Sequence, residues 1–494
     1  MELYFIKNIM SARHSLLLPM ILGCALIASS LPQHHAWAET AESPSPENSA
    51  KSMKSAKTAK NAKKSKTPKS AKTNHMSQQK TPDISADAKA ITIFSHAPDN
   101  HPERTLLAST IAEWNRNHPD KPVSLMPAPA DALTNPLVEF YAKDAAAQAD
   151  LAGNLPDIVD FYGANFASVA AREGLLPLND VLPKTLLDNF EPAFLRLGQY
   201  PENGYIYALP MIENSLAIWA RKSALMAIDA RIPTSVNDAW SRDEFEEILK
   251  NLATLPKVTY PLDVGLKKKT GVWDEFAFVP WIIQMEGDIF DPKTQKTQGS
   301  LNSPASVAAL AYLKSLLQQK LIAPADAKRN EAHPLTSIPM LYSGPWMATL
   351  LNKAHKDDYL LLPIPKLGPI PAAASVGWMF GINNNSKNPK EAGEFLAFLL
   401  SPRKIGDMSN RLGGIPATRD ALKYSRYYNN ASLQLFLDQF ANAPKTLLPH
   451  PNYAVISNEF SQALQTIIKG GDIQEILGLA ATNIDNAIAS EHKQ

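Results

Sequence analysis

The chain has 494 residues, 45% of them apolar, so it is long enough for two or three domains with sizeable cores. Its formal net charge of +1 averages two unlike parts. Residues 1–80 hold twelve Lys and Arg against four Asp and Glu, which leaves 37 basic and 44 acidic residues in 81–494. This mildly acidic body argues against nucleic acid as the main partner. The single cysteine, Cys24, excludes a disulfide or a cysteine-based metal site from the body.

The first 38 residues have the three regions of a secretory signal peptide. Lys7 and Arg13 are basic, residues 16–31 form an apolar run, and Ala36 and Ala38 are the small residues that a signal peptidase needs. We therefore expect this segment to be removed on export and the mature chain to be periplasmic.

Two alternatives to cleavage stay open. The apolar run is of marginal length for a permanent membrane anchor. Residues 21–24 also resemble a bacterial lipobox, in which Cys24 would be acylated and the chain would be a membrane-anchored lipoprotein. No second run of eighteen apolar residues follows, so we expect no membrane span in the mature chain.

Residues 39–88 are a low-complexity segment of Ala, Ser, Lys, Thr and Pro. Ten lysines and no acid lie between Lys51 and Lys80. Such a segment lacks the apolar area that offsets chain entropy, so we expect a disordered linker. It acts either as a solvated spacer or as a basic tail that is attracted to anionic lipid, envelope polymer or nucleic acid.

Strand and helix patterns alternate after the linker. Residues 91–94 are β-rich, residues 106–117 carry an apolar stripe of helical spacing, and residues 156–161 are predicted as a second strand. This alternation predicts an α/β fold with mostly parallel sheets. Two later helices are predicted to start at Pro304 and Pro389, with the preceding Ser303 and Asn388 as N-caps.

Several kinds of catalytic or cofactor site are not indicated. The sequence has no phosphate-binding glycine loop and no Gly-x-Ser-x-Gly elbow, and its eleven histidines are scattered, so we expect no cofactor and no metal. Glu286 and Asp288 flank Gly287 and form the best candidate for an acid/base pair, although turn chemistry or ligand hydrogen bonding is the simpler role.

A series of short sequence blocks follows one another between about residue 91 and residue 488. They include Leu155–Asp160, Gly204–Pro210, Ser343–Trp346, Ser375–Asn383 and Arg411–Thr418. Each block is weak by itself, but in their joint order the chain resembles the family 1 extracellular solute-binding proteins of bacterial ABC importers, the maltose-binding-protein type. The sharpest local match is Ser343–Trp346, whose tryptophan lines the cleft in the family.

The resemblance implies a two-lobed periplasmic binding protein fold of type II, with the ligand cleft between lobes that hinge crossings join. The N-terminal lobe would comprise residues 89–212 and 379–425, and the C-terminal lobe residues 213–378 and 426–494. The crossings are expected near 210–215, 375–382 and 421–428.

The family's chemistry selects the candidate ligand-binding residues. A sugar has apolar C–H faces that aromatic rings cover and a hydroxyl rim that planar polar groups satisfy. The candidates are Trp346, Trp378, Trp273 and Tyr162 for stacking, Glu213, Asp288 and Asn165 for hydrogen bonds, and Tyr453, which lies close to the place of a family tryptophan.

The implied function is the capture of a carbohydrate-type solute by hinge closure and its delivery to the membrane subunits of an ABC importer. A sugar, an oligosaccharide, a polyol or glycerol phosphate would fit. The typical Tyr-Asn-Lys-Asp segment is Trp219–Lys222 here, so maltose is not assumed. We expect a monomer with no specific nucleic-acid partner, which contacts the membrane only through the permease or a lipid anchor. A secreted carbohydrate-active enzyme and a tail-mediated envelope-interaction protein are the alternatives.

Overall fold

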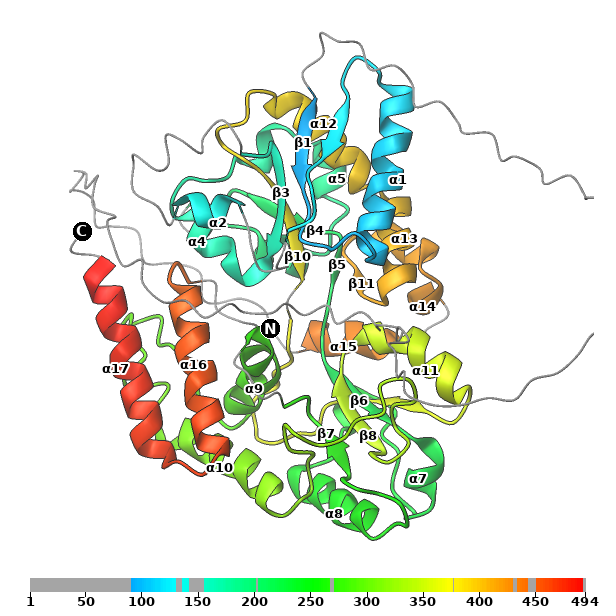
Figure 1. Ribbon diagram of the computed structural model, residues 1–494, viewed down its shortest axis with the longest axis vertical. Helices are drawn as coiled ribbons and strands as arrows, with labels where there is room; N and C mark the ends of the chain where they lie inside the picture. The colour runs from blue at the N-terminus through cyan, green and yellow to red at the C-terminus, as the bar shows by residue number, and fades with distance from the viewer. Residues whose placement is uncertain are drawn as a thin grey trace, which may run out of the picture.

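The structure is a computed structural model that describes residues 90–129, 136–141, 155–200, 203–266, 271–375, 377–429, 433–442 and 450–491. The predicted signal peptide, Cys24 and all of the predicted Lys-rich linker, residues 39–88, lie outside these residues. Figure 1 shows two halves, each with its own sheet, one above the other.

The upper half is built on a five-stranded sheet of order β2-β1-β3-β10-β4. Its strands are β1 (Ile91–Phe94), β2 (Val123–Leu125), β3 (Ile158–Tyr162), β4 (Ala208–Pro210) and β10 (Trp378–Ile382). β1 pairs in parallel with β2 and β3, whereas β10 pairs antiparallel with β3 and β4. Strand β10, which lies between β3 and β4, therefore comes from a part of the chain that is distant in sequence from the other four strands.

Helices cover the faces of this first sheet (Figure 1). In chain order they are α1 (Pro102–Asn117), α2 (Pro136–Tyr141), α4 (Phe166–Ala170), α5 (Lys184–Leu187), α6 (Pro192–Leu197), α12 (Pro389–Leu399), α13 (Pro402–Leu412) and α14 (Arg426–Asn429). Short 3-10 turns lie at Gly163–Asn165, Leu178–Asp180 and Arg419–Tyr424. The core beneath these helices includes Phe190, Phe194, Phe395 and Leu396, all at most 1% exposed.

The lower half is built on a four-stranded sheet of order β7-β8-β6-β9. The strands are β6 (Ala217–Ala220), β7 (Leu262–Asp263), β8 (Met340–Ser343) and β9 (Leu360–Leu362). Around it lie α7 (Lys222–Met226), α8 (Arg242–Ala253), α9 (Val272–Gln284), α10 (Pro304–Gln318), α11 (Ala348–His355), α16 (Tyr453–Ile468) and α17 (Ile473–Glu491), with 3-10 turns at Val236–Asp238 and Pro345–Met347.

Two features join the halves. The chain leaves the first sheet after β4, forms the short strand β5 (Ile212–Glu213) and enters the second sheet at β6; it returns between β9 and β10. β5 pairs with β11 (Ile415–Pro416). Helix α15 (Gln434–Asn442) lies between the halves in Figure 1, where the Phe440 ring packs on Phe194 at 4.6 Å and Gln439 donates to the Leu216 carbonyl at 2.8 Å.

The structure corrects three expectations of detail. The sheets are mixed rather than mostly parallel, because β10 and β6 run against their neighbours where the chain passes between sheets. The first helix starts at Pro102, four residues before the predicted start, because proline is suited to the first helical turn. Ser303 caps α10 by accepting from the Ser306 amide, as predicted, whereas Asn388 makes no side-chain cap hydrogen bond.

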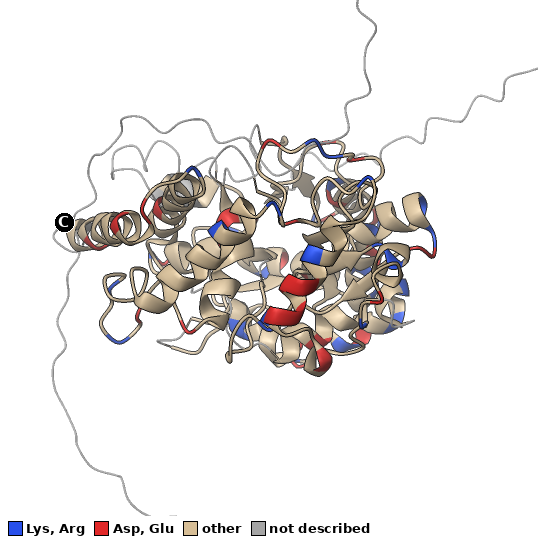
Figure 2. Ribbon diagram, turned by 90° about the horizontal axis from the view of Figure 1, so that it is seen from below, with Lys and Arg blue, Asp and Glu red and all other residues tan. Residues whose placement is uncertain are grey.

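No helix among the described residues is long and apolar enough to cross a bilayer. Figure 2 views the molecule from below and shows Lys and Arg interspersed with Asp and Glu over the outer helices.

Candidate ligand-binding site

An aromatic cluster lies where the two halves meet. Tyr162 ends β3 and is the register partner of Trp378, which starts β10. The two rings meet edge to face at 5.7 Å, and the Tyr162 ring lies 6.3 Å from the ring of Tyr453 at the start of α16. Val272 at the start of α9 packs against the same group. We call the three rings of Tyr162, Trp378 and Tyr453, together with Val272 that packs on them, the aromatic cluster. The cluster combines two strand ends of the first sheet with two helix starts of the lower half.

Glu213 lies beside this cluster on β5. Its side chain is 1% exposed and its carboxylate accepts a hydrogen bond from Ser375 Oγ at 3.2 Å. A Cβ atom at Gly377 would lie 2.5 Å from Glu213 Oε1, so only glycine lets this carboxyl approach the residue next to Trp378. Burial raises the pKa of Glu213 to about 8, although the hydrogen bonds from Ser375 and the Asn214 amide oppose the rise. Near pH 7 Glu213 is therefore a neutral acid that both donates and accepts.

Glu275 on α9 is a second buried carboxyl, which sequence reasoning missed. Burial raises its pKa to about 7, against the effect of Ser457 and Tyr453 on α16. Burial, together with the negative charges of Glu275 and Glu213, raises the pKa of Tyr162. Because both carboxyls act on this one phenol, both lie close to the aromatic cluster. The signal in the sequence was an acidic pair inside an otherwise apolar helix, Asp274 and Glu275.

Asp274 secures α9 to α16 from the same turn. Its Oδ2 accepts from Ser461 Oγ at 2.6 Å and from Gln465 Nε2 at 3.1 Å. Burial raises the pKa of Asp274 to about 6, less than it would without these two donors. The start of α9, which carries Glu275, is therefore held by a buried polar contact to the second half of α16, the helix whose first residue is Tyr453.

Trp273 and Trp346 form a second aromatic pair next to Val272. Their rings meet edge to face at 6.5 Å. Trp273 is 5% exposed and donates from Nε1 to the Val264 carbonyl at 3.0 Å, whereas Trp346, in the turn Pro345–Met347, is 36% exposed. Trp346 thus offers an accessible ring face, and Trp273 supports it.

The two remaining candidates lie in different surroundings. Asn165 is half-buried in the 3-10 turn that follows Tyr162, so it borders the aromatic cluster. Asp288 follows the far end of the 13-residue α9, roughly 20 Å from that helix's start. Its Oδ1 accepts from the Ile289 amide at 2.9 Å, and the neighbouring Glu286 is exposed. The structure does not bring Asp288 together with the cluster.

His96 was not selected from the sequence but lies against the cluster. Its ring stacks on Trp378 with centroids 3.3 Å apart and planes 1° from parallel. Asp160 on β3 holds it: Oδ1 accepts from the His96 amide at 2.7 Å and Oδ2 lies 3.0 Å from Nδ1. Burial lowers the pKa of His96, but Glu103 and Asp160 outweigh that effect and raise it. The only sequence signal was a histidine placed two residues after the end of a strand.

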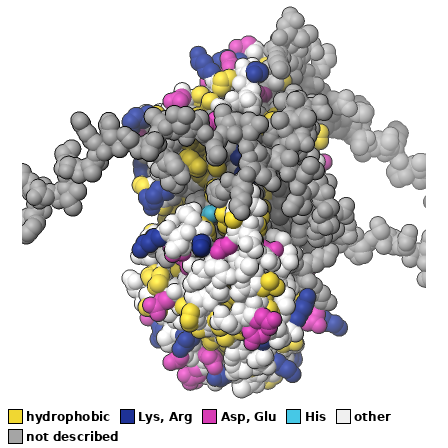
Figure 3. Space-filling model, turned by 90° about the vertical axis from the view of Figure 1, so that its left-hand side faces the viewer, with side chains coloured by type: hydrophobic (Ala, Val, Ile, Leu, Met, Phe, Trp, Pro, Cys, Tyr) yellow, Lys and Arg dark blue, Asp and Glu magenta, His cyan; other side chains and the backbone are white. Residues whose placement is uncertain are grey.

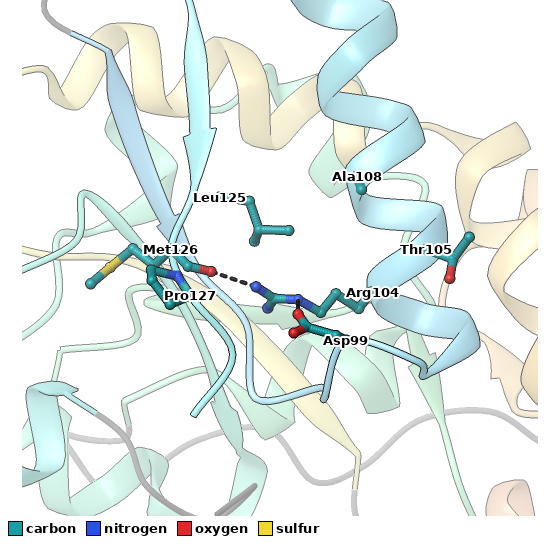
Figure 4. A pocket seen from close by; sticks show the side chains of 7 residues that line it. All are labelled: Asp99, Arg104, Thr105, Ala108, Leu125, Met126 and Pro127. Carbon is teal, nitrogen blue, oxygen red and sulfur yellow. Dashed lines mark hydrogen bonds and ion pairs between the residues drawn. The ribbon is translucent and has the colours of Figure 1, made fainter. Parts of the chain in front are cut away.

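The surface also has a shallow depression, of about 510 Å³, at the edge of the first sheet (Figure 4). It is lined by Asp99, Arg104, Thr105, Ala108, Leu125, Met126 and Pro127. Arg104 pairs with Asp99 at 2.9 Å and donates to the Met126 carbonyl at 2.5 Å, so its charge is already satisfied. No residue of the aromatic cluster lines this depression. Figure 3 shows hydrophobic side chains gathering instead where the upper and lower halves meet.

Known structures have the same architecture. Maltose-bound MalE3 of T. maritima aligns with a TM-score of 0.64 at 20% identity over 81% of this chain and 99% of its own. UgpB of Mycobacterium tuberculosis, solved with glycerophosphocholine, aligns with a TM-score of 0.65 at 18% identity over 82% of this chain and 99% of its own. These likenesses confirm the two-lobed, type II periplasmic binding protein fold.

Sequence comparison agrees with the fold. The arabinooligosaccharide-binding protein of Bacillus subtilis (strain 168) is 23% identical over 300 residues, which is 58% of this chain and 64% of that protein. The alignment therefore spans less than two thirds of that relative. The sequence profile of the bacterial extracellular solute-binding proteins matches residues 98–404, more than half of the chain. The expected family is thereby confirmed: this chain belongs to the bacterial extracellular solute-binding protein family.

Proposed function

We propose that this protein captures a carbohydrate-type solute between its two lobes and delivers it to an ABC importer. The observation that carries the proposal is the aromatic cluster, which both halves build and which two buried carboxyls border. The relative from B. subtilis is named for an arabinooligosaccharide, and MalE3 was solved with maltose, so related proteins bind solutes of this class.

The residues suit a sugar. Aromatic faces cover the C–H faces of a pyranose with large contact area at small entropic cost. A neutral acid at Glu213 can accept from one hydroxyl and donate to another, and Glu275, with a pKa of about 7, can accept in either protonation state; together they anchor the rim. Trp346 adds an exposed ring at the border of the same region. We assign the stacking to Trp378, Tyr162, Tyr453 and Trp346, and the hydrogen bonds to Glu213, Glu275 and Asn165.

The proposed lobes are those that the sequence suggests, residues 89–212 with 379–425 and 213–378 with 426–494. The passages between the two sheets support this division, and α15 bridges the boundary by packing on both halves. Closure would occur around β5, the segment before β10 and residues 421–428. A ligand that contacts both lobes stabilises the closed form, which the importer reads.

The partners and location follow from the same proposal. The membrane subunits of the importer would receive the solute, and the chain would act as an exported monomer in the periplasm, or tethered there through Cys24. The family is one of binding proteins, and Glu286 and Asp288 have turn positions rather than a shared cleft.

Isothermal titration tests the proposal. The tag-free protein is titrated with monosaccharides, arabino-, malto- and manno-oligosaccharides, polyols and glycerophosphodiesters. We expect saturable binding of at least one of them, and a loss of at least tenfold in affinity in Trp378→Ala and Tyr453→Ala, because both changes remove a stacking ring. Tyr205→Ala is the matched control, because Tyr205 is 45% exposed. Binding of none of these compounds by a folded protein would contradict the proposal.

A further inference from the structure

His96 and His101 lie in the segment that joins β1 to α1, and Glu103 lies beside them in the first turn of α1. Glu103 Oε2 is 3.5 Å from His96 Nε2 and 3.9 Å from His101 Nδ1. His96 and Glu103 are buried, and His101, the residue before α1, keeps about a quarter of its side chain exposed. Asp160 lies on β3 beside them, and its carboxylate and the side chains of His96 and Glu103 offer ligand atoms within 4.8 Å of one another.

We propose that His96, His101 and Glu103 bind a divalent transition-metal ion of the Zn²⁺ class, and that Asp160 is the positioning residue of this site. The proposal does not depend on the nature of the solute. It assigns a second binding function to the chain, next to the solute site but separate from it.

The spacing of the ligand atoms fits an ion better than direct hydrogen bonds. An N–H···O bond joins atoms about 2.7–3.2 Å apart, and both separations to Glu103 Oε2 are longer. Two ligand atoms that each lie about 2.0–2.1 Å from a tetrahedral Zn²⁺ are roughly 3.4 Å apart. The 3.5 Å between Glu103 and His96 matches this value, whereas the 3.9 Å between Glu103 and His101 is longer, so ion binding requires the partly exposed His101 ring to move toward Glu103.

The free nitrogen of His101 is the second observation that points to a ligand. His101 Nδ1 is shielded from solvent and has no hydrogen-bond partner. A buried ring nitrogen without a partner costs free energy, and an ion shared with Glu103 would satisfy it. Imidazole nitrogen with carboxylate oxygen is a donor set that Zn²⁺ and related ions accept.

Asp160 sets the orientation of His96 as the outer carboxylate of known metal sites does. Both of its oxygens contact His96, one the amide and one Nδ1. A proton held on Nδ1 leaves the lone pair of Nε2 free for the ion, which is the carboxylate–histidine–metal arrangement. Three protein ligands leave the fourth tetrahedral position to water. Since the His96 ring stacks on Trp378, the ion would also fix one wall of the aromatic cluster.

Zinc binding tests the site directly. The tag-free full chain, stripped with EDTA and dialysed, is titrated with ZnCl₂ against a chromophoric chelator, and bound metal is counted by mass spectrometry. We expect one ion per chain that raises the unfolding temperature. His101→Ala and Glu103→Gln should weaken binding by about a hundredfold or more, and Asp160→Asn by about 10–100-fold.

Two control variants lie in the same lobe. Glu113 is on α1 and pairs with Lys404, and His118 follows α1 and stacks on Trp114. Glu113→Gln and His118→Gln should bind zinc as the unchanged chain does. His101→Ala keeps the test valid if a buried variant fails to fold, because His101 is partly exposed.

Two results overturn the proposal. The first is that the unchanged chain binds no stoichiometric zinc at micromolar concentration. The second is that binding occurs but is unaffected in His101→Ala or in folded Glu103→Gln, which would place the ion elsewhere on the chain.

Discussion

Gly377 shows how the absence of a side chain at one position makes room for the candidate ligand-binding carboxyl of Glu213. An added Cβ would lie 2.5 Å from Glu213 Oε1 and 2.7 Å from the Ile212 carbonyl, and the latter is backbone that cannot rotate away. The glycine is therefore required by contact rather than by its own conformation.

Gly377→Ala should destabilise the protein by about 1–3 kcal/mol, because overpacking forces neighbouring groups to shift. Urea denaturation measures the change. Gly271→Ala is the matched control, because a Cβ there meets nothing within 4 Å. Equal stability of the two variants would contradict the prediction.

The buried acids also predict a pH dependence of stability. The pKa of Glu213 is about 8 in the folded chain and about 4.3 in an unfolded one. Between these values the folded state binds more protons, so the free energy of unfolding falls as the pH rises from 5 to 8. Each unit of difference between the folded and the unfolded pKa corresponds to about 1.4 kcal/mol of the free energy of unfolding that is lost over this pH range.

Denaturation at pH 5 and pH 8 tests this sign. Glu213→Gln should lose less stability between the two pH values than the unchanged chain does. Part of the loss should remain, because burial also raises the pKa of Glu275 to about 7. A protein that is more stable at pH 8 than at pH 5, or a variant that loses as much, would be inconsistent with neutral buried acids.

At the scale of single residues, the sequence predicted which residues belong to the site better than it predicted which of them contact each other. Trp378 and Tyr162 were selected as ring faces, but their contact depends on the antiparallel pairing of β10 with β3. His96 was missed because its partners, Asp160 and Trp378, are distant in sequence. Periodicity carries no information about such pairs. Asp288 was selected from a local block whose place at the end of α9 only the fold reveals.

At the scale of elements, helix starts were the most predictable features. Pro304, Pro389 and Pro402 each begin a helix, because proline lacks only an amide that the first turn does not use. Their caps were less predictable. Ser303 bonds to the Ser306 amide at 3.2 Å, whereas Ser401 and Asn388 make no side-chain cap hydrogen bond.

The caps give a paired prediction. Ser303→Ala should lower the free energy of unfolding by about 1 kcal/mol, the usual contribution of an N-cap. Ser401→Ala should change it by less than half as much, because no cap bond is lost. Thermal or urea unfolding of both variants decides it, and a larger loss in Ser401→Ala would refute the assignment.

Sheet direction could not be predicted from the strands alone. Strand patterns that alternate with helices indicate parallel sheets, yet β6 and β10 run antiparallel to their neighbours. Both lie where the chain passes from one sheet to the other. The direction of such strands depends on the path of the whole chain.

At the scale of the whole molecule, the two-sheet architecture followed from the family resemblance rather than from composition. Composition distinguishes the acidic body from the basic N-terminal part, residues 1–80. It does not indicate where the ligand cleft lies. The passages between sheets are long-range features that many weak sequence blocks indicate only together.

Removal of residues 39–88 should leave solute affinity unchanged within about twofold, because every residue assigned to the site lies after residue 90. Titration of the full and shortened chains with whichever solute binds measures this. A large loss would assign the Lys-rich segment a direct part in binding and favour the tail-mediated alternative.

Glu213 has a further consequence for motion. Its backbone pairs with Ile415 on β11, its carboxylate accepts from Ser375, and Gly377 packs on it. Three segments of the chain that are distant in sequence thus meet at Glu213: β5, β11 and the segment before β10. Because these segments contact one another at a single residue, we expect the lobes to be hindered from sliding or twisting against each other and to be free to rotate about an axis near Glu213. The lobes should therefore open and close by a hinge rotation near Glu213, and a solute that bonds to Glu213 would contact the hinge itself.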